Sequence, residues 1–99
     1  MTSNPVLEQL REGYLKSLAD KLSALRKAAE THDFDAISRI GHQLKGSGRS
    51  YGFHEVSELG GRIEQIGLDR RTALLDFMLV EFKTLLESLT NKSVVTEKP

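Results

Sequence analysis

Apolar residues recur at intervals of three or four positions along almost the whole of this 99-residue chain. That spacing follows the 3.6-residue turn of an α-helix, and no stretch alternates apolar and polar residues as a half-buried strand does. The connections between the periodic stretches are short, which places successive helices side by side in opposite directions. The pattern therefore predicts an all-α, antiparallel up-and-down four-helix bundle over residues 4–90. Residues 91–99 lose the period and are predicted to form a flexible tail.

The first helix is predicted to begin at Pro5, because Ser3 or Asn4 can cap it and proline suits a first helical turn. Gly13 weakens this helix locally, so it either bends one long helix or separates a short extra N-terminal helix from a longer one. The residues predicted to face the core are Val6, Leu10, Tyr14, Leu18, Leu22, Leu25 and Ala29.

The later helices have end signals of their own. Asp33 is suited to cap the second helix, and Gly52 is suited to end it in a left-handed conformation. Gly67 is predicted to stop the third helix, and Asp69 to cap the fourth. The core-facing residues predicted for these helices are Ile37, Ile40, Gly41, Leu44, Gly48 and Tyr51; Val56, Leu59, Ile63 and Ile66; and Leu75, Met78, Leu79, Phe82, Leu85, Leu86 and Leu89.

The charge balance, with 14 Lys and Arg against 14 Asp and Glu, argues against nucleic acid as the main partner. The absence of cysteine excludes disulfides and thiolate metal sites. The apolar runs are far too short to span a bilayer, and no basic segment followed by an apolar stretch marks a signal peptide. We therefore expect a cytoplasmic protein without a membrane partner.

His42, in the second helix, is predicted to point away from the core stripe and into solvent. Ser38 lies one turn before it, and Lys45 and Arg49 follow in the next two turns. An exposed imidazole beside two cations is suited to carry a phosphoryl group.

Four glycines lie close together in this helix, although each interior glycine costs about 1 kcal/mol relative to alanine. Gly41 and Gly48 fall on the core stripe, where they allow a neighbouring helix to approach closely. Gly46 points outward, where it would leave His42 accessible to another protein. The alternative for Gly46 is a flexible spot near the helix end.

The run HQLKGS at residues 42–47 resembles the histidine-containing phosphotransfer (HPt) domains of multistep phosphorelays. Further matches are Ala28, Ala29 and Asp33 upstream, Gly52 and Phe53 at the helix end, and Leu59, Ile63 and Glu64 downstream. The resemblance covers residues 7–89. Gly41 and Gly48 depart from it, since alanine is common at the first position and serine or alanine at the second, but both positions stay small.

The resemblance implies a phosphorelay intermediate of two-component signalling. His42 would accept a phosphoryl group from a receiver-domain aspartyl phosphate, or from a kinase, and pass it to another receiver. Lys45 would steady the added negative charge, with Arg49 as a second cation. Glu64 is the best candidate to accept a hydrogen bond from the other ring nitrogen, and a solvated helix face is its equally weighted alternative.

The implied partners are response-regulator receiver domains and a histidine kinase, contacted through residues flanking His42. The candidate contact residues are Ser38, Arg39, Gln43, Gly46 and Arg49. The Mg²⁺ needed for transfer is expected in the receiver, because no carboxylate cluster near His42 could hold it. We expect a phosphocarrier with no cofactor and no nucleotide site of its own, rather than an enzyme.

Two other kinds of site are disfavoured. His32 and His54 stand at distances from His42 that match no compact metal-ligand pattern. The Lys-Gly-Ser run at 45–47 lacks the upstream glycine and the preceding strand of a nucleotide-binding loop.

The runner-up function is a helical scaffold that binds receiver or kinase domains without carrying phosphate. Intact His42 and Lys45 on one exposed face disfavour it, since a scaffold needs neither.

Overall fold

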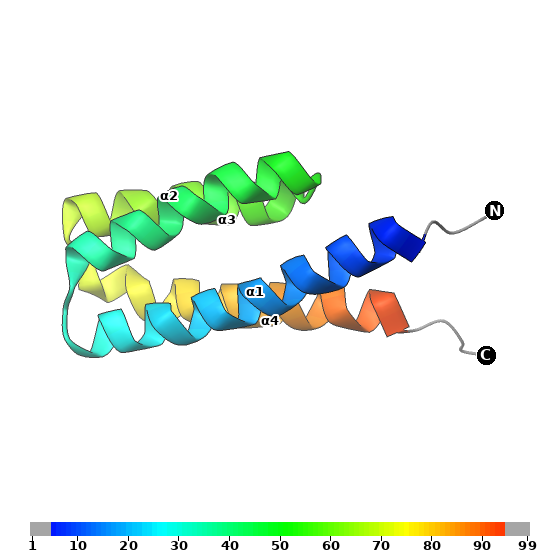
Figure 1. The fold of residues 1–99 in the computed structure, drawn as a ribbon. Helices are drawn as coiled ribbons and strands as arrows, with labels where there is room; N and C mark the ends of the chain where they lie inside the picture. Colours follow the sequence, from blue (N-terminus) through cyan, green and yellow to red (C-terminus); the bar gives the residue numbers. More distant parts are fainter. Residues whose placement is uncertain (1–4, 95–99) are drawn as a thin grey trace.

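The computed structural model describes residues 5–94, which contain four helices and no strand. The helices are α1 (Pro5–Glu30), α2 (Phe34–Tyr51), α3 (His54–Asp69) and α4 (Thr72–Val94). Successive helices run in opposite directions, and α1 lies beside both α2 and α4 (Figure 1). The predicted antiparallel up-and-down four-helix bundle is confirmed.

Helix α1 is continuous, so no separate short helix precedes it within the described residues. Gly13 lies inside α1, and the good helix formers on both sides outweigh its cost of about 1 kcal/mol. The predicted caps Ser3 and Asn4 lie outside the described residues.

Both predicted ends of α2 are confirmed. The side chain of Asp33 accepts a hydrogen bond from the backbone N–H of Ala36 at 3.1 Å, which satisfies one of the free donors of the first turn. Gly52 adopts the left-handed conformation with φ of 83°, which costs glycine nothing.

The prediction for the end of α3 is wrong. Gly67 lies buried inside the helix, which continues to Asp69. The chain leaves the helix at Arg70, which takes the left-handed conformation (φ 57°) without being a glycine. Asp69 therefore ends α3 and does not cap α4, and its carboxylate accepts a hydrogen bond from Gln65 at 3.2 Å.

Helix α4 also extends beyond its predicted end. Residues 91–94 continue the helix, so they do not belong to a flexible tail. The hydrophobic period ends at Leu89, but a helix can continue past its last core contact when its residues have adequate propensity. Residues 95–99 of the predicted tail lie outside the described residues.

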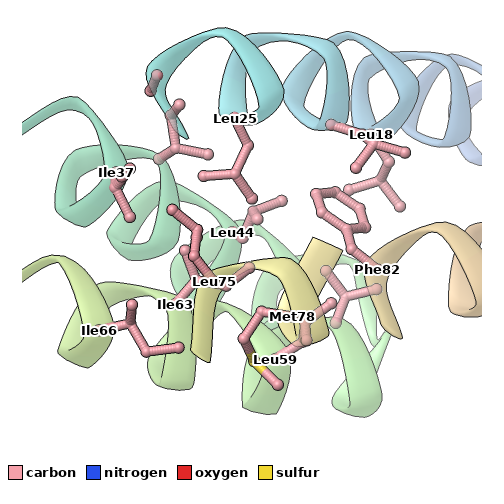
Figure 2. Packing of buried hydrophobic residues seen from close by; sticks show 14 of the residues in the cluster. Leu18, Leu25, Ile37, Leu44, Leu59, Ile63, Ile66, Leu75, Met78 and Phe82 are labelled. Carbon is pink, nitrogen blue, oxygen red and sulfur yellow. The ribbon is translucent and has the colours of Figure 1, made fainter. Parts of the chain in front are cut away.

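Buried apolar side chains from all four helices form one core. Leu25, Leu44, Ile63 and Leu75, one from each helix, gather around its centre (Figure 2). The buried face of each helix thus follows the predicted apolar stripe, because the helical period places the apolar residues on one side.

Three residues predicted to be buried are exposed: Val6 at 61%, Leu10 at 51% and Tyr51 at 50%. Helix α1 extends past the turn between α2 and α3, so fewer helices surround its first turns (Figure 1). Tyr51 lies in the last turn of α2 and stacks on Tyr14 with ring centroids 4.3 Å apart.

Helices α2 and α3 form the closest pair in the bundle. Gly41 and Gly48 of α2 lie against the backbone of α3, and Gly60 and Gly67 of α3 lie against the backbone of α2. A Cβ atom at any of the four would overlap backbone atoms of the facing helix. The close approach predicted for Gly41 and Gly48 is confirmed. Gly60 and Gly67 of α3 contribute to it equally, which was not predicted.

Candidate functional site

His42 stands on the outer surface of α2, and 70% of its side chain is exposed. Its helical neighbours Ile40, Gly41 and Leu44 are buried, so the direction of the imidazole follows from the helical period. The predicted exposure of His42 is confirmed, and the ring is open to a partner's approach.

Glu64 of α3 lies between two side chains of α2, those of His42 and Lys45. Its Oε2 is 3.1 Å from Nδ1 of His42, and its Oε1 is 3.0 Å from Nζ of Lys45. The contact depends on the glycine pair, because the backbone of Glu64 lies directly against Gly41. The two methylene groups and the carboxylate of Glu64 reach across because the helices are this close. Of the two interpretations left open for Glu64, the structure favours the contact with histidine.

The contact between His42 and Glu64 fixes the protonation pattern of a neutral imidazole. An ionised carboxylate can only accept hydrogen bonds, so Nδ1 must carry the proton and donate it. In the neutral ring Nε2 then holds the lone pair, on the side of the ring away from the carboxylate. Nε2 is therefore the ring nitrogen whose lone pair is available for bonding.

The hydrogen bond from the Lys45 ammonium holds the pKa of the Glu64 carboxyl below its usual value. Desolvation raises this pKa and the hydrogen bond with His42 lowers it further, and the lowering contacts prevail. Glu64 is therefore ionised at neutral pH, as the hydrogen bond to Nδ1 requires.

The candidate contact residues lie around His42, Lys45 and Glu64 but form no side-chain hydrogen bond with them. The amide oxygen of Gln43 accepts a hydrogen bond from Nζ of Lys21 on α1 at 2.7 Å. The hydroxyl of Ser38 donates to the carbonyl of Asp35 in its own helix at 3.1 Å. Arg39 is exposed as well.

Gly46 and Arg49 lie one and two turns beyond His42 on the exposed side of α2. A Cβ at Gly46 would meet nothing within 4 Å, so its predicted outward position is confirmed. Arg49 lines a shallow groove between α2 and α3 together with Lys45 and with the pair His54 and Glu58. A basic edge thus continues from Lys45 toward the turn between the two helices.

The other two histidines have different partners from those of His42. His54 pairs with Glu58 one turn on in α3, with Nε2 3.2 Å from the carboxylate. His32 lies in the turn before α2 and is tilted against the ring of Phe34. Within residues 5–94, no group of three or more His, Asp or Glu side chains is arranged to hold a metal ion.

Two supporting features were not predicted. The hydroxyl groups of Tyr14 and Ser47 are hydrogen-bonded at 2.9 Å, which ties α1 to the helix that carries His42. Gly60 lies against the backbone of Lys45 and holds α3 close below the site. The role of Gly60 could have been predicted from its position in the sequence, one turn before Glu64 and beside the predicted core stripe.

The family model of the Hpt domain matches residues 9–92. The chain belongs to the Hpt domain family. Hpt domains are phosphocarrier modules of two-component signalling. The match covers the whole site, all of α2 and α3, and all but the outer ends of α1 and α4. No curated protein and no solved structure matches the chain. Among the described residues, no helix is long and apolar enough to cross a membrane.

Proposed function

We propose that this Hpt domain is a phosphorelay intermediate that carries the phosphoryl group on Nε2 of His42. The observation that supports the proposal most strongly is the imidazole itself, which is 70% exposed and bound through Nδ1 to Glu64. On this proposal the donor is an aspartyl phosphate of a receiver domain, or a histidine kinase, and the acceptor is an aspartate of another receiver.

The transfer step needs no general base. The Nε2 lone pair attacks phosphorus, the bond between phosphorus and the aspartate oxygen breaks, and the aspartate leaves as a carboxylate. The ring keeps its Nδ1 proton, so it becomes a phosphorylated imidazolium. Glu64 stabilises that positive charge through the hydrogen bond it already makes with Nδ1. Transfer onward to a second receiver is the same step in reverse.

Lys45 stabilises the negative charge that the phosphoryl group brings to His42. Its ammonium pairs with Glu64, and with 46% of its side chain exposed it can turn toward the phosphoryl oxygens of His42. We assign Lys45 and Glu64 as the two groups that stabilise the phosphorylated state, and the basic edge at Arg49 as part of the partner surface with Ser38, Arg39, Gln43 and Gly46. The divalent metal is assigned to the receiver, and the cytoplasm is the compartment where the two meet.

The direct test is incubation with a receiver domain phosphorylated on aspartate, followed by isolation of this chain. We expect label that is stable in base and labile in acid, as a phosphoramidate is. His42→Gln should abolish it. His54→Gln is the matched control, because His54 is also exposed and also bound to a glutamate, Glu58. Labelling of the His42→Gln protein would refute the assignment, and a parent protein that binds receivers unlabelled would favour the scaffold.

Single-turnover rates test the two charged neighbours. Lys45→Ala and Glu64→Ala should each slow acceptance by about tenfold or more, the scale of one charge-assisted contact. Glu58→Ala is the control for a carboxylate that binds a histidine outside the site. Equal rates in all three variants would show that the Lys45–Glu64–His42 contacts are incidental to transfer.

A further inference from the structure

Lys21 of α1 carries its positive charge against the helix that carries His42. The side chain of Lys21 is half-buried, and its Nζ donates a hydrogen bond to Oε1 of Gln43 at 2.7 Å. Helix α1 lies beside α2 here (Figure 1), and Gln43 directly follows His42 in the chain. The ammonium of Lys21 therefore has a defined place on the α1 side of the site.

The charge of Lys21 is not neutralised by the residues that the structure describes. Gln43 is an amide, so it accepts the hydrogen bond but brings no negative charge. Lys45, on the other side of His42, is paired with Glu64 at 3.0 Å. Within residues 5–94, Lys21 forms no such ion pair with a carboxylate. Its charge is therefore available to a group on another molecule.

Lys21 lies within the area that a partner of His42 covers. The hydrogen bond to Gln43 places the Lys21 ammonium at most about 12 Å from the Cα atom of His42. An interface of ordinary size covers about 800 Å² of each partner, a patch about 32 Å across. Gly46, one turn after both His42 and Gln43, has open space at its Cβ position. A partner centred on His42 can therefore extend across α2 as far as Lys21.

A receiver domain presents negative charge at the position from which it transfers the phosphoryl group. Its aspartyl phosphate is an anion, and carboxylates hold the Mg²⁺ that transfer requires. An ammonium beside His42 therefore faces the edge of an acidic pocket when the receiver docks. Charges at the edge of an interface mainly decide which partners bind and how fast they associate.

We propose that Lys21 selects among receiver domains by pairing with a carboxylate at the edge of the receiver's metal-binding pocket. The inference rests on the proposed function, because it takes a receiver as the partner of His42. Gln43 is a positioning residue, since it holds the Lys21 ammonium in place. Receivers with a carboxylate at that edge bind more tightly, and receivers with a cation there are repelled. The contact forms on docking, so it changes binding and leaves the chemical step unchanged.

The first experiment measures binding without phosphoryl transfer. The probe is the receiver that labels the parent protein fastest, titrated in its unphosphorylated form with Mg²⁺. Lys21→Gln should weaken binding about fivefold or more at low ionic strength, and Lys21→Arg should retain the parent's affinity. Lys16→Gln is the matched control and should bind as the parent does, because Lys16 is exposed on the side of α1 away from its buried leucines. Circular dichroism checks that all three variants fold.

Salt provides a second measure of the same contact. The formal net charge of the chain is +0, so the salt dependence of binding reports charges near the interface and not an overall attraction. The difference between the parent and Lys21→Gln should shrink as salt is added. A difference that does not change with salt would overturn the ion pair.

Single-turnover transfer separates this inference from the proposed function. Lys21→Gln should raise the receiver concentration that gives half the maximal rate and leave the maximal rate unchanged. Over a panel of receivers, the size of the loss should differ from one receiver to the next. Equal affinities of Lys21→Gln and Lys16→Gln, a lower maximal rate, or the same loss for every receiver would overturn the inference while labelling of the parent upholds the proposed function. A parent protein that no receiver labels would overturn both.

Discussion

The close approach of α2 and α3 can be tested with two neighbouring glycines of α3. Gly60 lies against the backbone of α2, with a Cβ position overlapping the nitrogen of Lys45 and only 2.8 Å from the carbonyl oxygen of Gly41. Gly61, the next residue, would place its Cβ 3.5 Å from the flexible side chain of Lys45, an ordinary contact. Gly60→Ala and Gly61→Ala therefore differ in packing and in little else.

The magnitudes follow from two opposing effects. Each substitution gains about 1 kcal/mol of helix propensity. At Gly60 the added methyl group must push α2 away, and overpacking of this kind costs about 1–3 kcal/mol. The neighbours are backbone atoms that cannot rotate aside, so we take the upper value. Gly60→Ala should then be destabilised by about 2 kcal/mol and Gly61→Ala stabilised by about 1 kcal/mol.

Urea unfolding followed by circular dichroism at fixed pH measures both variants against the parent. For a domain of this size, a difference of about 3 kcal/mol between them corresponds to about 12–24 °C in melting temperature. The shift of α2 at Lys45 should also slow phosphoryl acceptance in Gly60→Ala but not in Gly61→Ala. Unfolding free energies within about 0.5 kcal/mol of each other would refute the close-approach argument.

Three further predictions concern single side chains. Tyr14→Phe should lower the free energy of unfolding by about 1 kcal/mol, because it removes the hydrogen bond to Ser47. Burial raises the pKa of Tyr14 in the parent protein, so the contribution of its hydroxyl to stability should fall as the pH rises above about 10. Urea midpoints from neutral to alkaline pH measure both effects. Asp33→Ala should cost about 1 kcal/mol by removing the N-cap of α2, and thermal unfolding would show no change if the cap were unimportant. Because Lys45 above all holds the pKa of Glu64 below 4.5, the ionised carboxylate stabilises the fold above that pH, and this contribution is lost as the pH falls through the lowered value. The urea midpoints of the parent and Glu64→Gln should therefore converge as the pH falls below 4.5, and a constant difference would contradict the assignment.

The helices and the exposed imidazole could be predicted because both depend on a single helix. Once the period is known, the buried Leu44 and the exposed His42 follow from their angles. Asp33 and Gly52 were equally predictable, since capping depends on residues within one turn.

The errors at Gly67, Val6 and Leu10 concern features that depend on more than one helix. Gly67 resembles a helix stop when α3 is considered alone, but it is required where α2 passes close to it. Val6 and Leu10 belong to the apolar stripe of α1, and their exposure follows from the different lengths of the helices. The single-helix period contains no information about helix lengths or interhelical distance.

The distance between α2 and α3 also connects the fold to the chemistry. Four interior glycines cost about 4 kcal/mol in helix propensity, a large share of the 5–15 kcal/mol typical of a small domain. In return the backbones approach closely enough for Glu64 to reach His42 and Lys45 together. A wider pair would need a longer polar side chain, which would lose more rotamer entropy and orient the imidazole less firmly. The glycines of this helix pair are therefore better explained by the placement of one carboxylate than by packing alone.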